Sequence, residues 1–242
     1  MKPLRYFVAV ILVAGACLTG RALYLHAKAE LAGVLIRRAW QVTARSGKSR
    51  PPWPWADTHP AARLRIPRLG YDEIVLEGAT ARTLAFGPAR LLSGAAFGEP
   101  GNLELAGHRD SWFEPLQGVA LGDSIELEWY DSRRAGLRTR TYIVDDIRVV
   151  APEDVGQLAP TSRDALTLVT CYPFGRSPRS PQRYIVRALP AGPSRRRGFP
   201  PLQSISPAAI RSMSLSRGTA PPCDYPSTKL WSRATALRCV FR

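Results

Sequence analysis

Two runs rich in β-forming residues bracket a cysteine and an arginine. The first run spans 165–171 and ends on Cys171, and the second opens at Arg183 after a loop. A cysteine at the end of a strand is held rigidly and can still be reached by a substrate. The thiolate is the nucleophilic form of a cysteine, and cationic neighbours favour it. We therefore predict that Cys171 is a nucleophile and that Arg183 is its electrostatic helper.

A catalytic thiol also needs a group that moves protons, and histidine is the commonest one. Two of the three histidines precede residue 62, which leaves His108 in the strand-rich middle, directly after the apolar run 103–106. Taken singly, a cysteine at a strand end is often only a small buried side chain, and a lone histidine only a satisfied polar one. The occurrence of Cys171, His108 and Arg183 together favours a catalytic site.

Residues near these three are weaker candidates for a role in the site. Thr170 precedes Cys171 and is predicted either to line the substrate site or to be an ordinary strand threonine. Arg187 shares a strand face with Arg183 because their spacing is even, so it competes for the arginine role. Its place deeper in the strand favours Arg183. The two residues after His108 are expected at most to order its loop.

The middle of the chain reads as short strands separated by turn signals. Ile125, Leu127 and Trp129 alternate with polar residues, which is the pattern of a half-buried strand. Two short helices fit near 83–86 and 112–116. The fold class we predict is all-β, a closed barrel of about eight strands with short helices. The expected strands are 63–66, 74–77, 103–106, 124–130, 140–150, 166–171 and 183–189.

The N-terminal region 1–27 contains an apolar run that continues to Leu25 with one interruption at Arg21. Its length of about twenty residues is what a membrane-spanning helix requires. We favour an uncleaved transmembrane helix, because an amphipathic helical pattern follows it directly. A cleaved signal peptide with the small residues 14–16 at its cleavage site is the alternative. The distribution of Lys and Arg does not decide the orientation.

Three further domains follow from composition. Residues 28–62 are expected to form a juxtamembrane helix and a Pro/Trp-rich linker, and 63–191 the catalytic barrel. The basic, Pro/Ser/Arg-rich tail 192–242 is expected to be disordered. The net charge of +15 resides in the two ends, since 63–191 holds sixteen basic and sixteen acidic residues. A neutral middle argues against nucleic-acid binding.

Metal and disulfide chemistry are also disfavoured by the residue types. The predicted barrel contains one histidine and one cysteine, too few for the three or four ligands of a zinc site without carboxylates. Four cysteines in the whole chain are few for a disulfide scaffold. We therefore expect neither a metal nor a cofactor.

The motifs around the three candidates resemble one family as a set. Thr167-Leu-Val-Thr-Cys171, with Arg183 twelve residues on and His108 upstream, resembles the Thr-Leu-x-Thr-Cys…Arg signature of sortases. Gly-His-Arg-Asp-Ser-Trp-Phe113 and Cys-Tyr-Pro-Phe174 are similar to the proteobacterial, class D-like branch of that family. The resemblance extends back through Trp53-Pro-Trp-Ala-Asp57 and covers roughly residues 1–191.

The resemblance implies a sortase-type β-barrel and a membrane-anchored cysteine transpeptidase. Such an enzyme cleaves a Leu-Pro-x-Thr-Gly-like C-terminal sorting signal of a secreted protein through a thioester and transfers the acyl group to an amine. It also implies that Cys171 is the nucleophile, His108 the general acid/base and Arg183 the third catalytic residue. Such substrates imply a single-pass protein of the inner (cytoplasmic) membrane with its catalytic domain in the periplasm.

Other functions remain open at this stage. Another cysteine acyl transferase or peptidase of the cell envelope is one, although the Gly-Cys-x-Arg core of L,D-transpeptidases is missing and papain-like hydrolases place cysteine before histidine. A membrane-anchored binding module without activity is another. The loop 172–182 does not align closely with the family, and it borders the expected substrate groove, so the exact sorting signal is not predicted.

Overall fold

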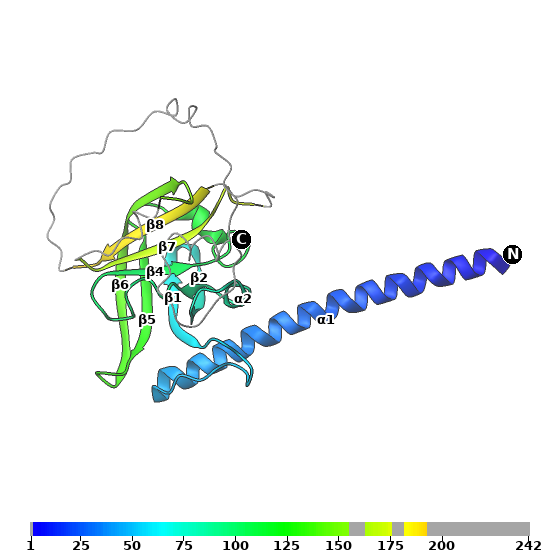
Figure 1. Cartoon of the computed structure of the whole chain (residues 1–242), viewed down its shortest axis with the longest axis horizontal. Coiled ribbons are helices and arrows are strands. Elements are labelled where there is room, and N and C mark those ends of the chain that lie inside the picture. The colour runs from blue at the N-terminus through cyan, green and yellow to red at the C-terminus, as the bar shows by residue number, and fades with distance from the viewer. Residues whose placement is uncertain (1, 155–162, 176–181, 193–242) are drawn as a thin grey trace, which may run out of the picture.

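The strand-rich middle of the chain closes into an eight-stranded barrel (Figure 1), which confirms the predicted fold class. The computed structural model describes residues 2–154, 163–175 and 182–192. Nearly all of the tail 192–242 therefore lies outside the described residues. The strands are β1 (Pro60–Ile66), β2 (Tyr71–Glu77), β3 (Ala89–Arg90), β4 (Asn102–Ala106), β5 (Ser124–Asp131), β6 (Gly136–Val150), β7 (Ala165–Tyr172) and β8 (Gln182–Pro190).

The order of the strands around the barrel is β1-β2-β3-β4-β7-β8-β6-β5. The pairing of β1 with β5, in which Leu64 lies opposite Leu127, closes the ring. Most neighbours are antiparallel, but β2 and β3, and β4 and β7, run parallel. β4 therefore lies beside β7 although the two are far apart in sequence, and the carboxyl ends of β4 and β7 lie at the same end of the barrel.

Alternation along the strands divides the buried apolar side chains into two clusters. The interior cluster fills the barrel, and its fully buried members include Leu166 and Leu168 of β7. The second cluster, which we call the outer layer, contains Val169 of β7 and residues from outside the barrel. The outer layer consists of Ile36, Trp40, Ile74, Leu76, Leu84, Ala89, Leu91, Ala106, Val169 and Ile185.

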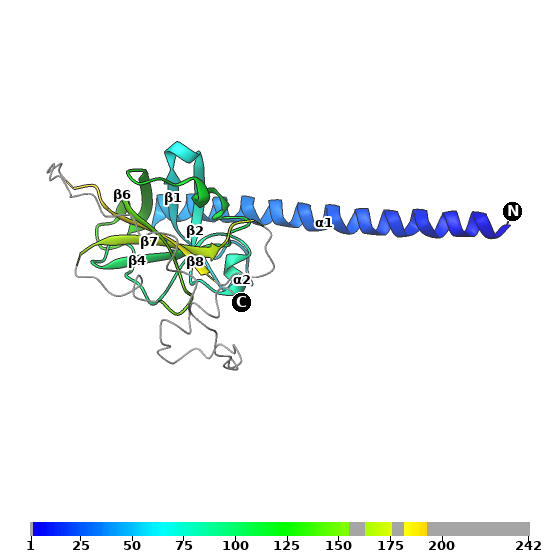
Figure 2. The ribbon, with the colours of Figure 1, turned by 90° about the horizontal axis from the view of Figure 1, so that it is seen from above.

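A single helix, α1 (Lys2–Ser46), precedes the barrel. Figures 1 and 2 show its C-terminal part against the barrel and the remainder leading away from it. Ala32, Ile36, Ala39 and Trp40 are buried there, at the spacing that places residues on one side of a helix. The helix ends at Gly47, whose positive φ of 68° suits a glycine C-cap.

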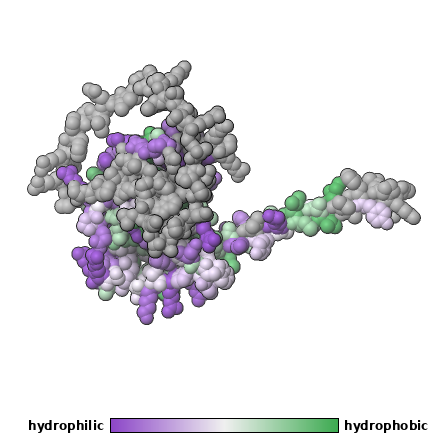
Figure 3. Space-filling view, viewed as in Figure 1, coloured by the Kyte–Doolittle hydropathy of each residue, from purple (hydrophilic) through white to green (hydrophobic). Residues whose placement is uncertain are grey.

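Residues 11–24 of α1 are largely apolar and exposed, and Figure 3 shows a green, hydrophobic stretch along the projecting helix. Leu12 is 67% exposed and Leu18 is 70% exposed. The membrane-spanning helix expected over 1–27 is not found: in the parts of the chain that the structure describes, no helix is long and apolar enough to cross a membrane.

Three short helices connect the strands: η1 (Pro67–Leu69), α2 (Ala81–Leu84) and η2 (Glu114–Gly118). The last two lie within two residues of the expected positions. In the segment between α1 and β1, the Thr58 hydroxyl donates a hydrogen bond of 2.7 Å to the Glu77 carbonyl of β2. The segment predicted to be a linker is thus in contact with the folded domain.

Candidate active site

Cys171 and Arg183 lie directly opposite each other on β7 and β8. Directly paired residues of antiparallel strands direct their side chains to the same face of the sheet. Both are largely buried, with 8% and 7% of their surfaces exposed. One guanidinium nitrogen of Arg183 donates to the Gln182 carbonyl at 3.0 Å. The register therefore places the predicted nucleophile beside the predicted cation.

His108 comes to the same place from the parallel neighbour β4. Ala106 pairs with Val169 in the β4–β7 ladder, and His108 and Cys171 each lie two residues further along. The Gly107 amide continues the ladder by donating to the Val169 carbonyl at 3.3 Å. The register thus brings the three sequence-predicted residues to neighbouring positions: His108 follows the end of β4, Cys171 lies near the end of β7 and Arg183 near the start of β8.

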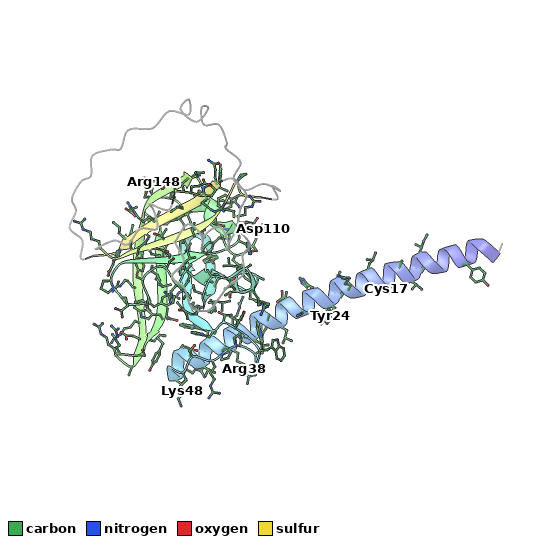
Figure 4. All side chains as sticks on the ribbon, viewed as in Figure 1. Cys17, Tyr24, Arg38, Lys48, Asp110 and Arg148 are labelled. Carbon is green, nitrogen blue, oxygen red and sulfur yellow. The ribbon has the colours of Figure 1, made fainter. Side chains whose placement is uncertain are left out.

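The candidates lie on the outer face of the barrel. Val169 and Ile185 belong to the outer layer, and each is two residues from Cys171 or Arg183, which places it on the same strand face. Figure 4 shows Asp110, two residues beyond His108, on the barrel well away from Lys48, which follows the C-terminus of α1. The side chains of the outer layer therefore lie next to the candidate residues on the same strand faces.

Thr170, predicted either to line the substrate site or to be an ordinary strand threonine, is fully buried. It lies between Val169 and Cys171 on β7, so its side chain points to the interior. Its hydroxyl donates a hydrogen bond of 2.7 Å to the Gly107 carbonyl. This geometry favours the second alternative, an ordinary strand threonine: the hydrogen bond of Thr170 connects the chain just before His108 to the strand that carries Cys171.

Arg109 makes a second connection between the two loops, which sequence reasoning expected only in general terms. Its guanidinium donates to the Pro173 carbonyl at 2.8 Å, so the residue after His108 holds a residue just after Cys171. Arg187, the competitor for the arginine role, pairs with Asp145 at 2.7 Å. That ion pair engages Arg187 elsewhere and leaves Arg183 as the arginine beside the cysteine.

Phe113 contacts the loop that carries His108 from the interior of the barrel. Its ring is fully buried in the interior cluster, and its amide donates to the His108 carbonyl at 2.8 Å. A Cβ added at Gly107 would lie 2.7 Å from the Cγ of this ring. Glycine at 107 therefore permits the close approach that fixes the loop.

Three aromatic rings close the base of the β7–β8 loop. Tyr172 stacks on Tyr184 at 6.2 Å between ring centroids, and Phe174 meets Tyr184 edge-to-face at 5.0 Å. Burial raises the pKa of the Tyr184 phenol, and the charge of Tyr172 adds to the shift. These rings restrain the strand ends on either side of Cys171 and Arg183.

A thiol beside a guanidinium, with an imidazole on the next strand, suits nucleophilic attack on a carbonyl. In the ranges that the structure covers, no group of three or more His, Cys, Asp or Glu side chains could hold a metal ion. The described geometry thus offers the parts for covalent acyl transfer.

Comparison with known proteins agrees with this interpretation. The family model described as "Sortase domain" matches residues 64–191. Sortase D of Bacillus subtilis (strain 168) is 27% identical over 124 residues, which are 51% of this chain. The chain spans only 60% of the length of that relative.

Solved structures give the same result for the fold. A sortase D5 transpeptidase of Clostridium perfringens is 21% identical and has a TM-score of 0.53, over 67% of this chain and 99% of that one. A lid mutant of sortase A from Corynebacterium diphtheriae is 25% identical with a TM-score of 0.50, over 69% of this chain and 96% of that one. The barrel is thus similar to sortase barrels along nearly their full length.

Proposed function

Because the chain belongs to the sortase family, we propose that it is a cysteine transpeptidase in which Cys171, His108 and Arg183 perform the chemistry. The observation that supports this proposal is the register in which β7 pairs with β4 and with β8. Cys171 is paired with Arg183 across β7 and β8, and His108 follows two residues after Ala106, the β4 partner of Val169. The family gives the reaction class, and the register supports the choice of these three residues.

In the first half-reaction the Cys171 thiolate attacks the carbonyl carbon of the scissile peptide bond. Arg183 donates hydrogen bonds to the oxygen that gains negative charge, which stabilises the tetrahedral intermediate. The C–N bond then breaks, and the His108 imidazolium gives its proton to the departing amine. The products of this step are a thioester on Cys171 and a neutral imidazole.

In the second half-reaction an acceptor amine attacks the thioester carbonyl. His108, now neutral, takes the proton that the amine loses. The C–S bond breaks, the electron pair returns to the Cys171 sulfur, and an amide joins the acyl group to the acceptor. The imidazolium and the thiolate are both restored, so no external oxidant or reductant is needed.

The substrate we propose is a secreted protein with a Leu-Pro-x-Thr-Gly-like C-terminal sorting signal, and the acceptor is a primary amine. The proposal for the substrate rests on the family alone. The loop between Cys171 and Arg183, part of which lies outside the described residues, is the segment in which we expect the choice of signal.

We further propose that the catalytic barrel works on the outer side of the cytoplasmic membrane and is attached to it through the N-terminal part of α1. The support is the exposed apolar surface of that helix, which includes Ile11, Val13 and Leu23. A reporter enzyme fused after Ala191 would be active in the periplasm if this topology holds. Reporter activity in the cytoplasm would overturn it.

Mass spectrometry of the intact protein after exposure to a library of sorting-signal peptides tests the activity. We expect an acyl adduct on Cys171 that disappears on addition of an amine. The Cys171→Ala variant is the control and should form no adduct. If the parent protein remains unmodified by every peptide and Cys171 alkylates at the rate of an ordinary thiol, the chain is a binding module instead.

A further inference from the structure

Residues 53–58, which precede the barrel, dock on the helix α2. The ring of Trp53 meets that of Phe86 edge-to-face, with 5.1 Å between centroids and 67° between planes. Both rings are half-buried and pack against the outer layer. Trp53 therefore contacts the chain directly after α2.

Two further contacts secure this docking segment. Thr58 is 5% exposed, and its hydroxyl donates to the Glu77 carbonyl at 2.7 Å. Asp57 lies 3.4 Å from a guanidinium nitrogen of Arg82 in α2. The Asp57–Arg82 pair is exposed and contributes little, so the ring contact and the buried hydroxyl hold the segment in place.

α2 depends on such contacts because it comprises only four residues, Ala81–Leu84. A single helical turn is not stable by itself. The Thr80 hydroxyl caps it by accepting from the Thr83 amide at 3.1 Å, and Leu84 is fully buried in the outer layer. The position of α2 is thus set by what packs on either side of it.

α2 also contacts the loop that carries His108. The indole N–H of Trp112 donates to the Leu84 carbonyl at 3.0 Å. Trp112 is adjacent to Phe113, whose amide donates to the His108 carbonyl. A continuous series of contacts therefore runs from Trp53 through α2 to the loop of His108.

We propose that the docking segment positions His108 through α2, and that Trp53 is a positioning residue of the site. The inference rests on the proposed transpeptidase function and deepens it. Proton transfer requires the imidazole within hydrogen-bond reach of the reacting groups. Displacement of a catalytic group by about 1 Å can lower a rate by about 100-fold. A shift of α2 would reach His108 through the Trp112 hydrogen bond.

The segment contains its own control residue. Trp55 is 80% exposed and lies two residues from Trp53. A change at Trp55 removes the same indole from the same segment without removing the ring contact to Phe86. The pair Trp53→Ala and Trp55→Ala thus separates the effect of this contact from a general effect of altering the segment.

The test measures peptide transfer, the rate of Cys171 alkylation by iodoacetamide across pH, and thermal unfolding in the full-length protein. For Trp53→Ala we expect kcat to fall by about 10- to 100-fold, with little change in KM. The pH profile of alkylation should also differ from that of the parent. Trp53→Phe should restore most of the activity because it restores an edge-to-face ring pair. Trp55→Ala should match the parent.

Equal effects of Trp53→Ala and Trp55→Ala would overturn the proposal. An activity loss that merely follows the fraction of unfolded protein, with an unchanged alkylation profile, would also overturn it. If the parent transfers no peptide, the transpeptidase function fails, and the alkylation profiles still decide whether Trp53 affects the environment of Cys171.

Discussion

The two faces of β7 differ in what they support. Leu166 and Leu168 point into the interior cluster, which the barrel and its connections form by themselves. Val169 points into the outer layer, which also receives Ile36 and Trp40 from α1. The candidate catalytic residues lie beside the outer layer. We therefore expect substitutions on the interior face to act mainly on stability and substitutions on the outer face to act also on catalysis.

The neighbours Leu168 and Val169 give the largest contrast. Leu168→Ala empties space in the fully buried interior, and the free energy of unfolding should fall by about 2–5 kcal/mol. The activity of each folded molecule should hardly change. Val169→Ala removes fewer atoms, so the free energy of unfolding should fall less, but it changes the packing of the outer layer next to Cys171. Urea unfolding and active-site titration measure both quantities. Equal activity per folded molecule in the two variants would contradict the division.

Arg183→Lys tests the outer face, where the candidate catalytic residues lie. Lysine keeps the charge but loses the planar fork of donors, and loss of one oxyanion donor typically lowers a rate by about 100- to 1000-fold. We expect that loss in single-turnover acylation of Cys171, with an almost unchanged unfolding midpoint. Arg187→Lys is the matched control on the same strand, since Arg187 pairs with Asp145. A near-parental rate for Arg183→Lys would remove the guanidinium from the mechanism.

Gly107→Ala is expected to affect both faces, because Gly107 joins the His108 loop to the interior. The new Cβ would lie 2.7 Å from the buried Phe113 ring, and such overpacking costs about 1–3 kcal/mol. Activity per folded molecule should fall as well. Gly136→Ala is the control, because its Cβ would meet an ordinary contact at 3.8 Å. Calorimetry combined with the transfer assay separates the two effects.

The smallest expected effect is on the pH dependence of stability, and it arises from a residue outside both apolar clusters. The Arg68 guanidinium, hydrogen-bonded to Asp123, holds the pKa of that carboxyl below its ordinary value, while burial opposes the shift. A lowered native pKa stabilises the fold above the unfolded pKa of about 4, and this contribution disappears as pH falls through the native value.

Asp123→Asn should therefore be less stable than the parent at pH 7 and should approach it near pH 2.5. Urea titrations at both pH values measure the difference. A stability difference that is the same at both pH values would assign the effect to packing of the side chain rather than to its charge.

The sequence predicted the barrel and its three candidate catalytic residues because these depend on local patterns. The alternation of residues 124–130 corresponds to β5, and the runs that end at Cys171 and begin at Arg183 correspond to β7 and β8. Periodicity could not reveal β3, which has only two residues, since so short a strand is defined by its partners alone.

Contacts between distant segments were beyond the sequence patterns. Nothing in the neighbourhood of Trp40 or Trp53 indicated that these residues share an apolar layer with Val169. The orientation of Thr170 was in principle available from its odd offset to Cys171. That signal would have placed its hydroxyl on the interior face, where it is found.

The continuity of α1 has a mechanical consequence. Helical residues rise 1.5 Å each, so the part of α1 before Ala32, the first residue buried against the barrel, extends roughly 45 Å. A flexible chain with the same number of residues would have an average end-to-end distance of roughly 30 Å and no preferred direction. A continuous helix instead keeps this length nearly constant, and Figure 2 shows that it is straight. The barrel would then stay at a nearly constant distance from the N-terminal end of α1, and only partners presented at that distance would be within reach.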